Sequence, residues 1–165
     1  MSITSEAFRQ AMRHFPAGVT IVTIKAGEQR HGLTVSAFVS ISPEPPLIMV
    51  AIDERHHAYE LLEQEGAVFA VNILHQEQTD LSNRFAWIKD EDRFAQGSWG
   101  TAVTGAPILE DALSWLDCTI YDRFKAGTHM LYLGEVQASA VLQEEKPPLI
   151  YWHQGYRQLK LKDGE

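Results

Sequence analysis

Apolar and polar residues alternate along much of this chain, which predicts strands. Residues 33–41 place apolar side chains at every second position, with Thr34, Ser36 and Ser40 between them. Successive side chains of a strand point to opposite faces, so these hydroxyls are expected on one face. Alternating or continuous apolar runs predict further strands at residues 19–24, 47–52, 67–74, 113–124, 130–142 and 149–152.

Other apolar residues recur at helical spacing and predict short helices at residues 4–14, 57–64 and 76–88. Turns are expected at residues 26–28 and 125–128, whereas residues 89–107 are predicted to form loops and short strands. About seven strands with two or three short helices are typical of one antiparallel barrel with helical decoration.

Composition narrows the class of protein. The 165 residues, 45% of them hydrophobic, suit one domain spanning residues 1–165. The net charge of −8 argues against a nucleic-acid or anionic-membrane partner. A single cysteine, Cys118, excludes an intrachain disulfide and is expected in the core. The first residues lack a signal-peptide pattern, and no apolar run is long enough to span a membrane, so a cytoplasmic location is expected.

The sequence carries no recognisable catalytic motif. A glycine-rich dinucleotide loop, a nucleophile elbow and a zinc-protease motif are all missing, and the scattered histidines do not indicate a metal site. If the protein is an enzyme, its chemistry is expected to come from a bound cofactor. The strand that carries the hydroxyls and the proline-rich loop after it (residues 43–46) predict a rigid wall of a binding site for a flat ligand. The alternative is a solvent-facing strand that ends in a surface turn.

Six segments, in order along the chain, resemble the flavin reductase family. They are FPAGVTIVT (15–23), GLTVSAFVSISPEPPLIMVAI (32–52), FAVNIL (69–74), LSNRFA (81–86), GTHMLYLGEV (127–136) and PLIYWHQGYRQL (148–159). The family comprises small reductase components of two-component flavin monooxygenases. The resemblance implies a mainly β, single-domain antiparallel split barrel of the Greek-key, FMN-binding type with a few short helices.

The resemblance also implies a flavin site. The residues expected to line the isoalloxazine and ribityl groups are Thr34, Val35, Ser36, Ala37, Ser42 and Pro43. Ala51 and Ile52 are expected near the ring, and Ser82, Arg84 and Phe85 near the flavin phosphate. An arginine and a serine suit a phosphate because both donate hydrogen bonds and the arginine is always charged.

A second implied site binds the nicotinamide. Relatives often have Gly-Asp-His where this chain has Gly127-Thr128-His129, so the histidine is kept and a threonine replaces the acid. His129 is expected to position the nicotinamide, with Thr128 beside it. Tyr156 and Arg157 are expected to cover the pocket. The missing acid leaves the preference for NADH or NADPH open.

These residues predict an NAD(P)H-dependent flavin reductase that transfers hydride from the nicotinamide to FMN or FAD. The resemblance further implies a homodimer that supplies reduced flavin to a partner oxygenase. Three alternatives stay open: a reductase that passes electrons to another acceptor such as ferric iron, a non-catalytic FMN-binding electron-transfer protein of the same fold, and a barrel that binds another ligand.

Overall fold

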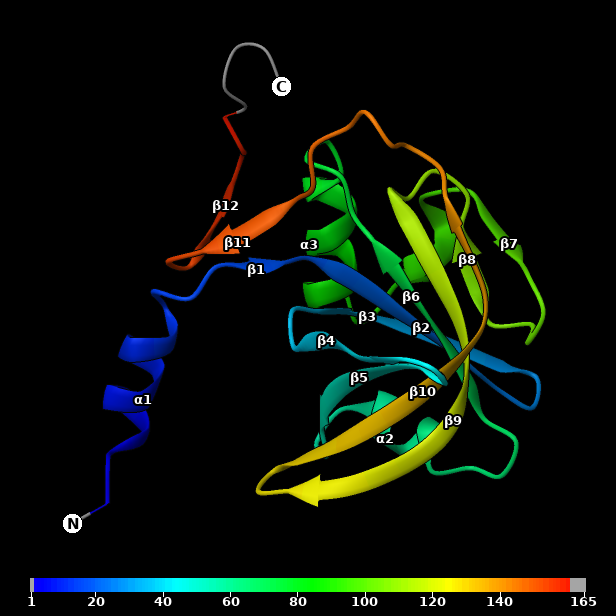
Figure 1. The fold of residues 1–165 in the computed structure, drawn as a ribbon, viewed down its shortest axis with the longest axis horizontal. Coiled ribbons are helices and arrows are strands. Elements are labelled where there is room, and N and C mark those ends of the chain that lie inside the picture. Colours follow the sequence, from blue (N-terminus) through cyan, green and yellow to red (C-terminus); the bar gives the residue numbers. More distant parts are fainter. Residues whose placement is uncertain (1, 161–165) are drawn as a thin grey trace.

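The computed structural model describes residues 2–160, so the predicted domain of residues 1–165 extends beyond the described residues at both ends. Its main element is an antiparallel seven-stranded sheet with the order β3-β2-β6-β9-β10-β5-β4 (Figure 1). The strands are β2 (Thr20–Ala26), β3 (Gln29–Val35), β4 (Phe38–Pro43), β5 (Pro46–Asp53), β6 (Val68–Ile73), β9 (Ser114–Ala126) and β10 (His129–Val141).

The two edge strands of this sheet, β3 and β4, are consecutive in the sequence. Only Ser36 and Ala37 lie between them, so the sheet curls until its edges meet. The backbone amide of Ala51 on β5 donates to the carbonyl of Ala37, at 3.0 Å, and holds the crossing in place. This curled antiparallel sheet is the predicted split barrel.

The prediction of one strand over residues 33–41 is wrong, because the chain changes pairing partner in the middle of that stretch. β3 pairs with β2, and β4 pairs with β5 at the opposite edge. Leu33 and Val35 face the core, but Val39 and Ile41 are 45% and 49% exposed. The strand break therefore reverses which positions point inward.

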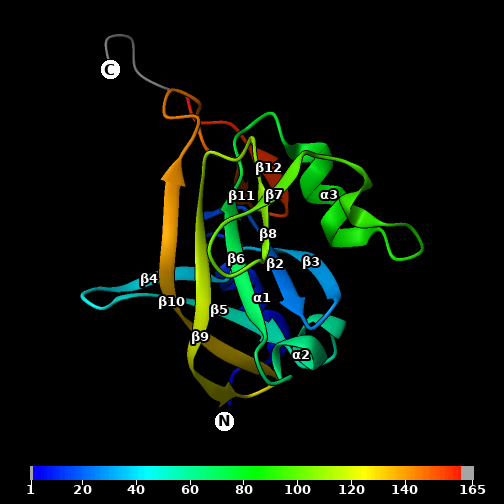
Figure 2. The same ribbon diagram turned by 90° about the vertical axis from the view of Figure 1, so that its right-hand side faces the viewer.

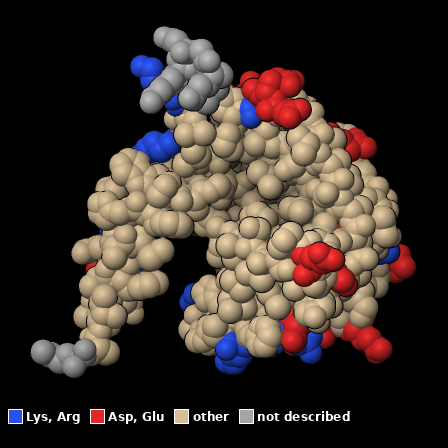
Figure 3. Space-filling view, in the orientation of Figure 1, with Lys and Arg blue, Asp and Glu red and all other residues tan. Residues whose placement is uncertain are grey.

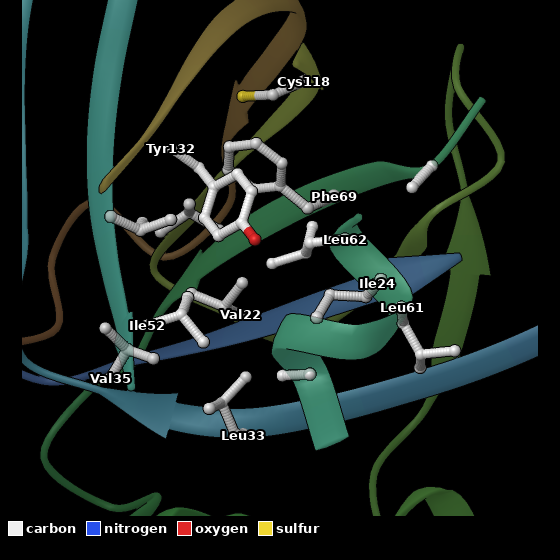
Figure 4. Packing of buried hydrophobic residues seen from close by; sticks show 14 of the residues in the cluster. Val22, Ile24, Leu33, Val35, Ile52, Leu61, Leu62, Phe69, Cys118 and Tyr132 are labelled. Atoms are coloured by element: carbon white, nitrogen blue, oxygen red, sulfur yellow. The ribbon is translucent and has the colours of Figure 1, made fainter. Parts of the chain in front are cut away.

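The barrel encloses one of the hydrophobic clusters. Figure 4 shows Phe69 and Tyr132 in this cluster together with Val22, Ile52 and Leu62 of α2 (His57–Leu62). Cys118 has no exposed surface and belongs to this core, as predicted. Full burial of each large apolar side chain stabilises the fold by about 1.5–3 kcal/mol.

A second cluster fixes α3 (Thr79–Trp87) against β3. Phe85 is fully buried and its ring meets those of Phe94 and Trp99 at centroid distances of 5.3 Å. A Cβ at Gly32 would lie 2.5 Å from the Phe85 ring, so a side chain at this position would push α3 away from β3. Phe94 lies in the short helix η1 (Arg93–Ala95), and Trp99 begins the small hairpin of β7 (Trp99–Thr101) and β8 (Pro107–Leu109).

A small sheet of β1 (Ala17–Gly18), β11 (Ile150–Trp152) and β12 (Gly155–Arg157) lies beside the barrel. The sequence predicted β11 but neither β1 nor β12. The turn before β12 has positive φ at His153 and Gln154, 51° and 62°. Such turns usually contain Asn-Gly or Gly, and no such pair marks a hairpin at these positions.

Two elements project from the barrel. The helix α1 (Ser5–Met12) stands apart in Figure 1 and has no buried residue. The turn between β4 and β5 extends away from the barrel in Figure 2. The helices predicted at residues 4–14, 57–64 and 76–88 are confirmed as α1, α2 and α3, each shorter than predicted. Among the described residues, no helix has the length and apolar character needed to cross a membrane.

Candidate flavin-binding site

The break between β3 and β4 opens into a groove made of adjoining cavities. The first, here called the central cavity, has a volume of about 320 Å³, and its lining includes Thr34, Ser36, Asn83 and Tyr156. The second, the outer cavity, has a volume of about 520 Å³, and its lining includes Ser36, Ala37 and Ala51. Ser36 borders both cavities, so five of the predicted residues lie along one continuous groove.

A hydrogen-bonded chain forms the wall of the central cavity. The hydroxyl of Thr34 donates to the carbonyl oxygen of Ser82 at 2.6 Å. The Ser82 hydroxyl lies 2.8 Å from the Tyr156 hydroxyl, which donates to Asn83 at 3.1 Å. These bonds join β3, α3 and β12. They hold Tyr156, which was predicted to cover the pocket, at the groove.

Ser36 and Ala37 are exposed and lie outside both strand ladders. Their side chains are small, so a planar ligand can approach this part of the backbone closely. The groove can therefore hold a flat ligand with polar edges.

Three of the predicted flavin residues have buried apolar side chains. Val35, Ile52 and Phe85 are 6%, 1% and 0% exposed and belong to the two hydrophobic clusters. Their side chains support the groove from behind, because they are enclosed by the core. A direct contact between them and a flavin stays a prediction.

Arg84 has protein partners in this structure. Its guanidinium donates to the carbonyls of Arg93, at 3.0 Å, and Asp92, at 2.6 Å, and forms an ion pair with Glu91 at 3.3 Å. These contacts fasten the loop after α3 to the helix. A role of Arg84 toward a flavin phosphate stays a prediction.

The structure does not bring Ser42 and Pro43 to the rest of the site. They pair with Leu47 and Pro46 at the far end of β4. Ser42 is five residues beyond Ala37, which corresponds to roughly 17 Å along an extended strand.

His129 begins β10 and lies opposite Asp53 in the strand register. The hydroxyl of Thr128 is 3.0 Å from Nδ1 of His129. Hydrogen bonds from Arg55 hold the pKa of Asp53 well below its usual range, so Asp53 is a carboxylate. Ala51 is two residues before Asp53, about 7 Å along β5, which places His129 beyond the outer cavity.

Arg157 is exposed on β12, and its guanidinium donates to the carbonyl of Tyr156 at 2.8 Å. It also lies over the Trp152 ring, 5.7 Å from the centroid. Arg157 lies next to Tyr156, with which it was predicted to cover the pocket. That role stays a prediction.

The sequence reasoning missed several groove residues. Asn83, Ala86 and Trp87 line the central cavity from α3, and Trp87 is 75% exposed. The helical period could have placed Asn83 and Ala86 on one face. Among residues 2–160, no three His, Cys, Asp or Glu side chains are grouped as a metal site.

The fold and the groove define a split-barrel protein of the class that the resemblance predicted. Residues 12–160 match the family described as flavin reductase like domain. The chain belongs to this family.

Relatives and solved structures agree with this assignment. The reductase component of 4-hydroxyphenylacetate 3-monooxygenase from Thermus thermophilus is 37% identical, over 93% of this chain and 96% of that protein. The actinorhodin polyketide dimerase of Streptomyces coelicolor is 39% identical, over 92% and 84%. The structure of the flavin reductase PheA2 matches with a TM-score of 0.85 and 34% identity, over 96% of this chain and all of that one. The predicted fold and enzyme class, an NAD(P)H:flavin oxidoreductase, are confirmed.

The burial of His31 beside the groove predicts a pH dependence of stability. Burial, followed by the charges of Arg93 and two neighbouring histidines, lowers the pKa of His31 from 6.5 to about 4. Between these values the unfolded chain binds a proton that the folded chain does not, so stability falls as the pH drops from 6.5 to 4. Thermal unfolding followed by circular dichroism should show a smaller fall in His31→Gln than in the wild type.

The exposed His14 offers a matched control, because His14→Gln should keep the wild-type fall in stability. If the stability of His31→Gln and of the wild type depended on pH in the same way, the fall in stability could not be attributed to His31.

Proposed function

We propose that this chain binds FMN or FAD over the break at Ser36 and Ala37 and reduces it with NADH or NADPH. The single observation that carries the proposal is the groove at this break. Hydroxyl-bearing residues and Tyr156 line the central cavity, and the small side chain of Ala51 lines the outer cavity. A bound flavin would accept the hydride at its ring nitrogen N5.

The residues present fit such a group. A flat ring needs a shallow, close approach to the backbone, which the small residues at the strand break provide. Its polar edge needs hydrogen-bond partners, and Ser36 together with the neighbouring backbone groups can supply them. Thr34 and Tyr156 act mainly as fixed walls, because each already has a partner.

His129 is proposed to position the nicotinamide. Hydride transfer needs the two rings in close, parallel contact but no acid or base from the protein, so positioning is the main contribution of the chain. His129 follows the β9–β10 turn, with Thr128 beside it, and both side chains lie at the edge of the barrel. Retention of this histidine favours a reductase over a non-catalytic flavin carrier.

The reduced flavin is proposed to pass to a separate oxygenase. Several relatives are named as reductase components of monooxygenases, including those from Thermus thermophilus and a Rhizobium species. An open groove favours release of the product. A single domain over residues 1–165 and a cytoplasmic location, where nicotinamide cofactors are available, stay predictions.

A homodimer is proposed because the apolar face of α1 is uncovered. Phe8 and Met12 of α1 are 56% and 47% exposed, and Phe15, just after the helix, is 68% exposed. Figure 3 shows an open notch between the α1 segment and the body of the protein, with mostly uncharged walls. The outer cavity lies there, and Met12 and Phe15 contribute to its lining. Exposed apolar surface of this extent is typical of an interface, and a second copy would cover it.

Steady-state oxidation of NADH tests the proposed reaction. The wild type should oxidise NADH only when FMN or FAD is present, with a rate that saturates in flavin. His129→Ala should raise the KM for NADH about tenfold, which corresponds to about 1.4 kcal/mol of lost binding. The Kd for flavin should not change, because His129 lies outside the cavities that border Ser36.

His14→Ala is the control for this substitution and should leave both constants unchanged. Tight flavin binding without oxidation of either NADH or NADPH would refute the reductase and leave a flavin carrier. A protein that binds no flavin would contradict the whole proposal.

The dimer is tested by sedimentation velocity. The wild type should sediment at twice the chain mass, whereas a variant with both Phe8→Ser and Met12→Ser should sediment as a monomer, because the substitutions remove the apolar face of α1. Val103, also an exposed apolar residue at 70%, provides the control Val103→Ser. A monomeric wild type would disprove the dimer.

A further inference from the structure

The turn between β9 and β10, which carries Thr128 and leads into His129, is fastened to the segment that follows β5. The backbone amide of Glu54 donates to the carbonyl of Thr128 at 3.1 Å. The Glu54 carboxylate also forms an ion pair at 2.9 Å with Lys125, which lies on β9 just before the turn. Movement of the turn would break both contacts, so the end of β5 fixes where His129 lies.

Asp53, the last residue of β5, lies directly opposite His129. Because Glu54 and Thr128, the next pair along, share a backbone hydrogen bond, Asp53 and His129 form a non-hydrogen-bonded pair. Side chains of such a pair point to the same face of the sheet, with Cβ atoms about 4.5–5.5 Å apart. Ala51 points to this face as well, so the carboxylate and the imidazole extend the face that lines the outer cavity.

The Asp53 carboxylate is a fixed charge. Arg55 donates to its Oδ1 from the backbone amide, at 2.9 Å, and from Nε, at 3.0 Å, and to its Oδ2 from the guanidinium, at 2.6 Å. The side chain of Asp53 is only 12% exposed, whereas that of Arg55 is 86% exposed. These bonds keep the pKa of Asp53 well below its usual range, so the group stays ionised and in one orientation.

The His129 ring has one hydrogen-bond partner, the Thr128 hydroxyl, which lies 3.0 Å from Nδ1. This hydroxyl can donate to Nδ1, which leaves the ring proton on Nε2, or accept from it. Within residues 2–160, no carboxylate lies within ion-pair distance of the ring. Asp53 therefore acts on His129 across a gap, through its charge rather than through a direct bond.

We propose that Asp53 is a positioning residue for His129 and, through it, for the nicotinamide. The inference rests on the proposed function, which gives His129 its role toward this ring. The carboxylate attracts the N–H edge of the imidazole from β5, while the Thr128 hydroxyl holds Nδ1 from the turn. The histidine is thus kept in one orientation before the dinucleotide arrives. Because Arg55 balances the charge of Asp53, the pair does not repel the phosphates of the dinucleotide.

Steady-state kinetics at saturating FMN test this role. Asp53→Asn keeps the shape of the side chain and removes its charge, so the KM for NADH should rise about fivefold while the Kd for FMN stays unchanged. Asp53→Glu keeps the charge on a longer side chain and should recover part of the loss. Asp122→Asn is the control, because it changes an exposed carboxylate on β9 that accepts only from the neighbouring Arg123 amide. It should leave the KM for NADH unchanged.

A double-mutant cycle separates positioning from a general structural effect. In the His129→Ala background, Asp53→Asn should leave the KM for NADH unchanged, because the carboxylate then has no ring to orient. A fivefold rise that is the same with and without His129 would show that Asp53 acts by another route, and would overturn the inference.

Nuclear magnetic resonance tests the effect on the ring without any NADH. The imidazole C–H signals of His129, identified by their loss in His129→Ala, should shift in Asp53→Asn and stay in place in Asp122→Asn. Unshifted His129 signals, or a wild-type KM for NADH in Asp53→Asn, would overturn the inference and leave the proposed function standing. A wild type that oxidises neither NADH nor NADPH would refute the proposed function, and the role of Asp53 toward the nicotinamide with it, even if the signals shift.

Discussion

The rest of the site depends on one constraint, the crossing of the chain from one edge of the sheet to the other at Ser36 and Ala37. Backbone groups in a sheet are normally paired on both sides or left at an edge. Here two edges meet, and two small residues form the connection. The hydrogen bond from the Ala51 amide to the Ala37 carbonyl fixes the crossing, so the groove is built into the fold.

The parts of the groove come from segments far apart in the sequence, and packing brings them together. Phe85 locks α3 against Gly32, which carries Ser82 to the hydroxyl of Thr34. Tyr156 then fastens β12 to the same helix. Arg84 and Arg93 hold the loop after α3, and this loop lines a further cavity that also borders Thr34.

This arrangement suits a protein whose chemistry resides in its ligands. The described residues show positioning groups and paired ions around the groove rather than an acid–base pair. The cavities on either side of Ser36 can hold a flat ring.

Local patterns were enough to predict most of the strands, the three helices and the burial of Cys118. They failed at residues 33–41, where the alternation of Leu33 and Val35 continues through Val39 although the pairing partner changes. No local signal marks that change, because it depends on where β5 lies. The β11–β12 turn escaped prediction because His153 and Gln154 adopt positive φ without a glycine.

The candidate site was predicted in part. Thr34, Ser36, Ala37, Ala51 and Tyr156 lie along the groove, whereas Ser42 lies at the far end of β4. The contact between His31 and His57 could not be predicted, because the two residues are distant in the sequence and meet only through the curl of the sheet. Their rings lie 5.4 Å apart in the structure.

The central claim is that flavin binds over the strand break, and a flavin titration of Ala51→Leu tests it most directly. The larger side chain would fill the outer cavity beside Ala37, so the Kd for FMN and for FAD should rise at least tenfold. Ala102→Leu, at an exposed alanine outside the three cavities, should bind both flavins as the wild type does. A folded Ala51→Leu variant with wild-type affinity for both flavins would contradict the account.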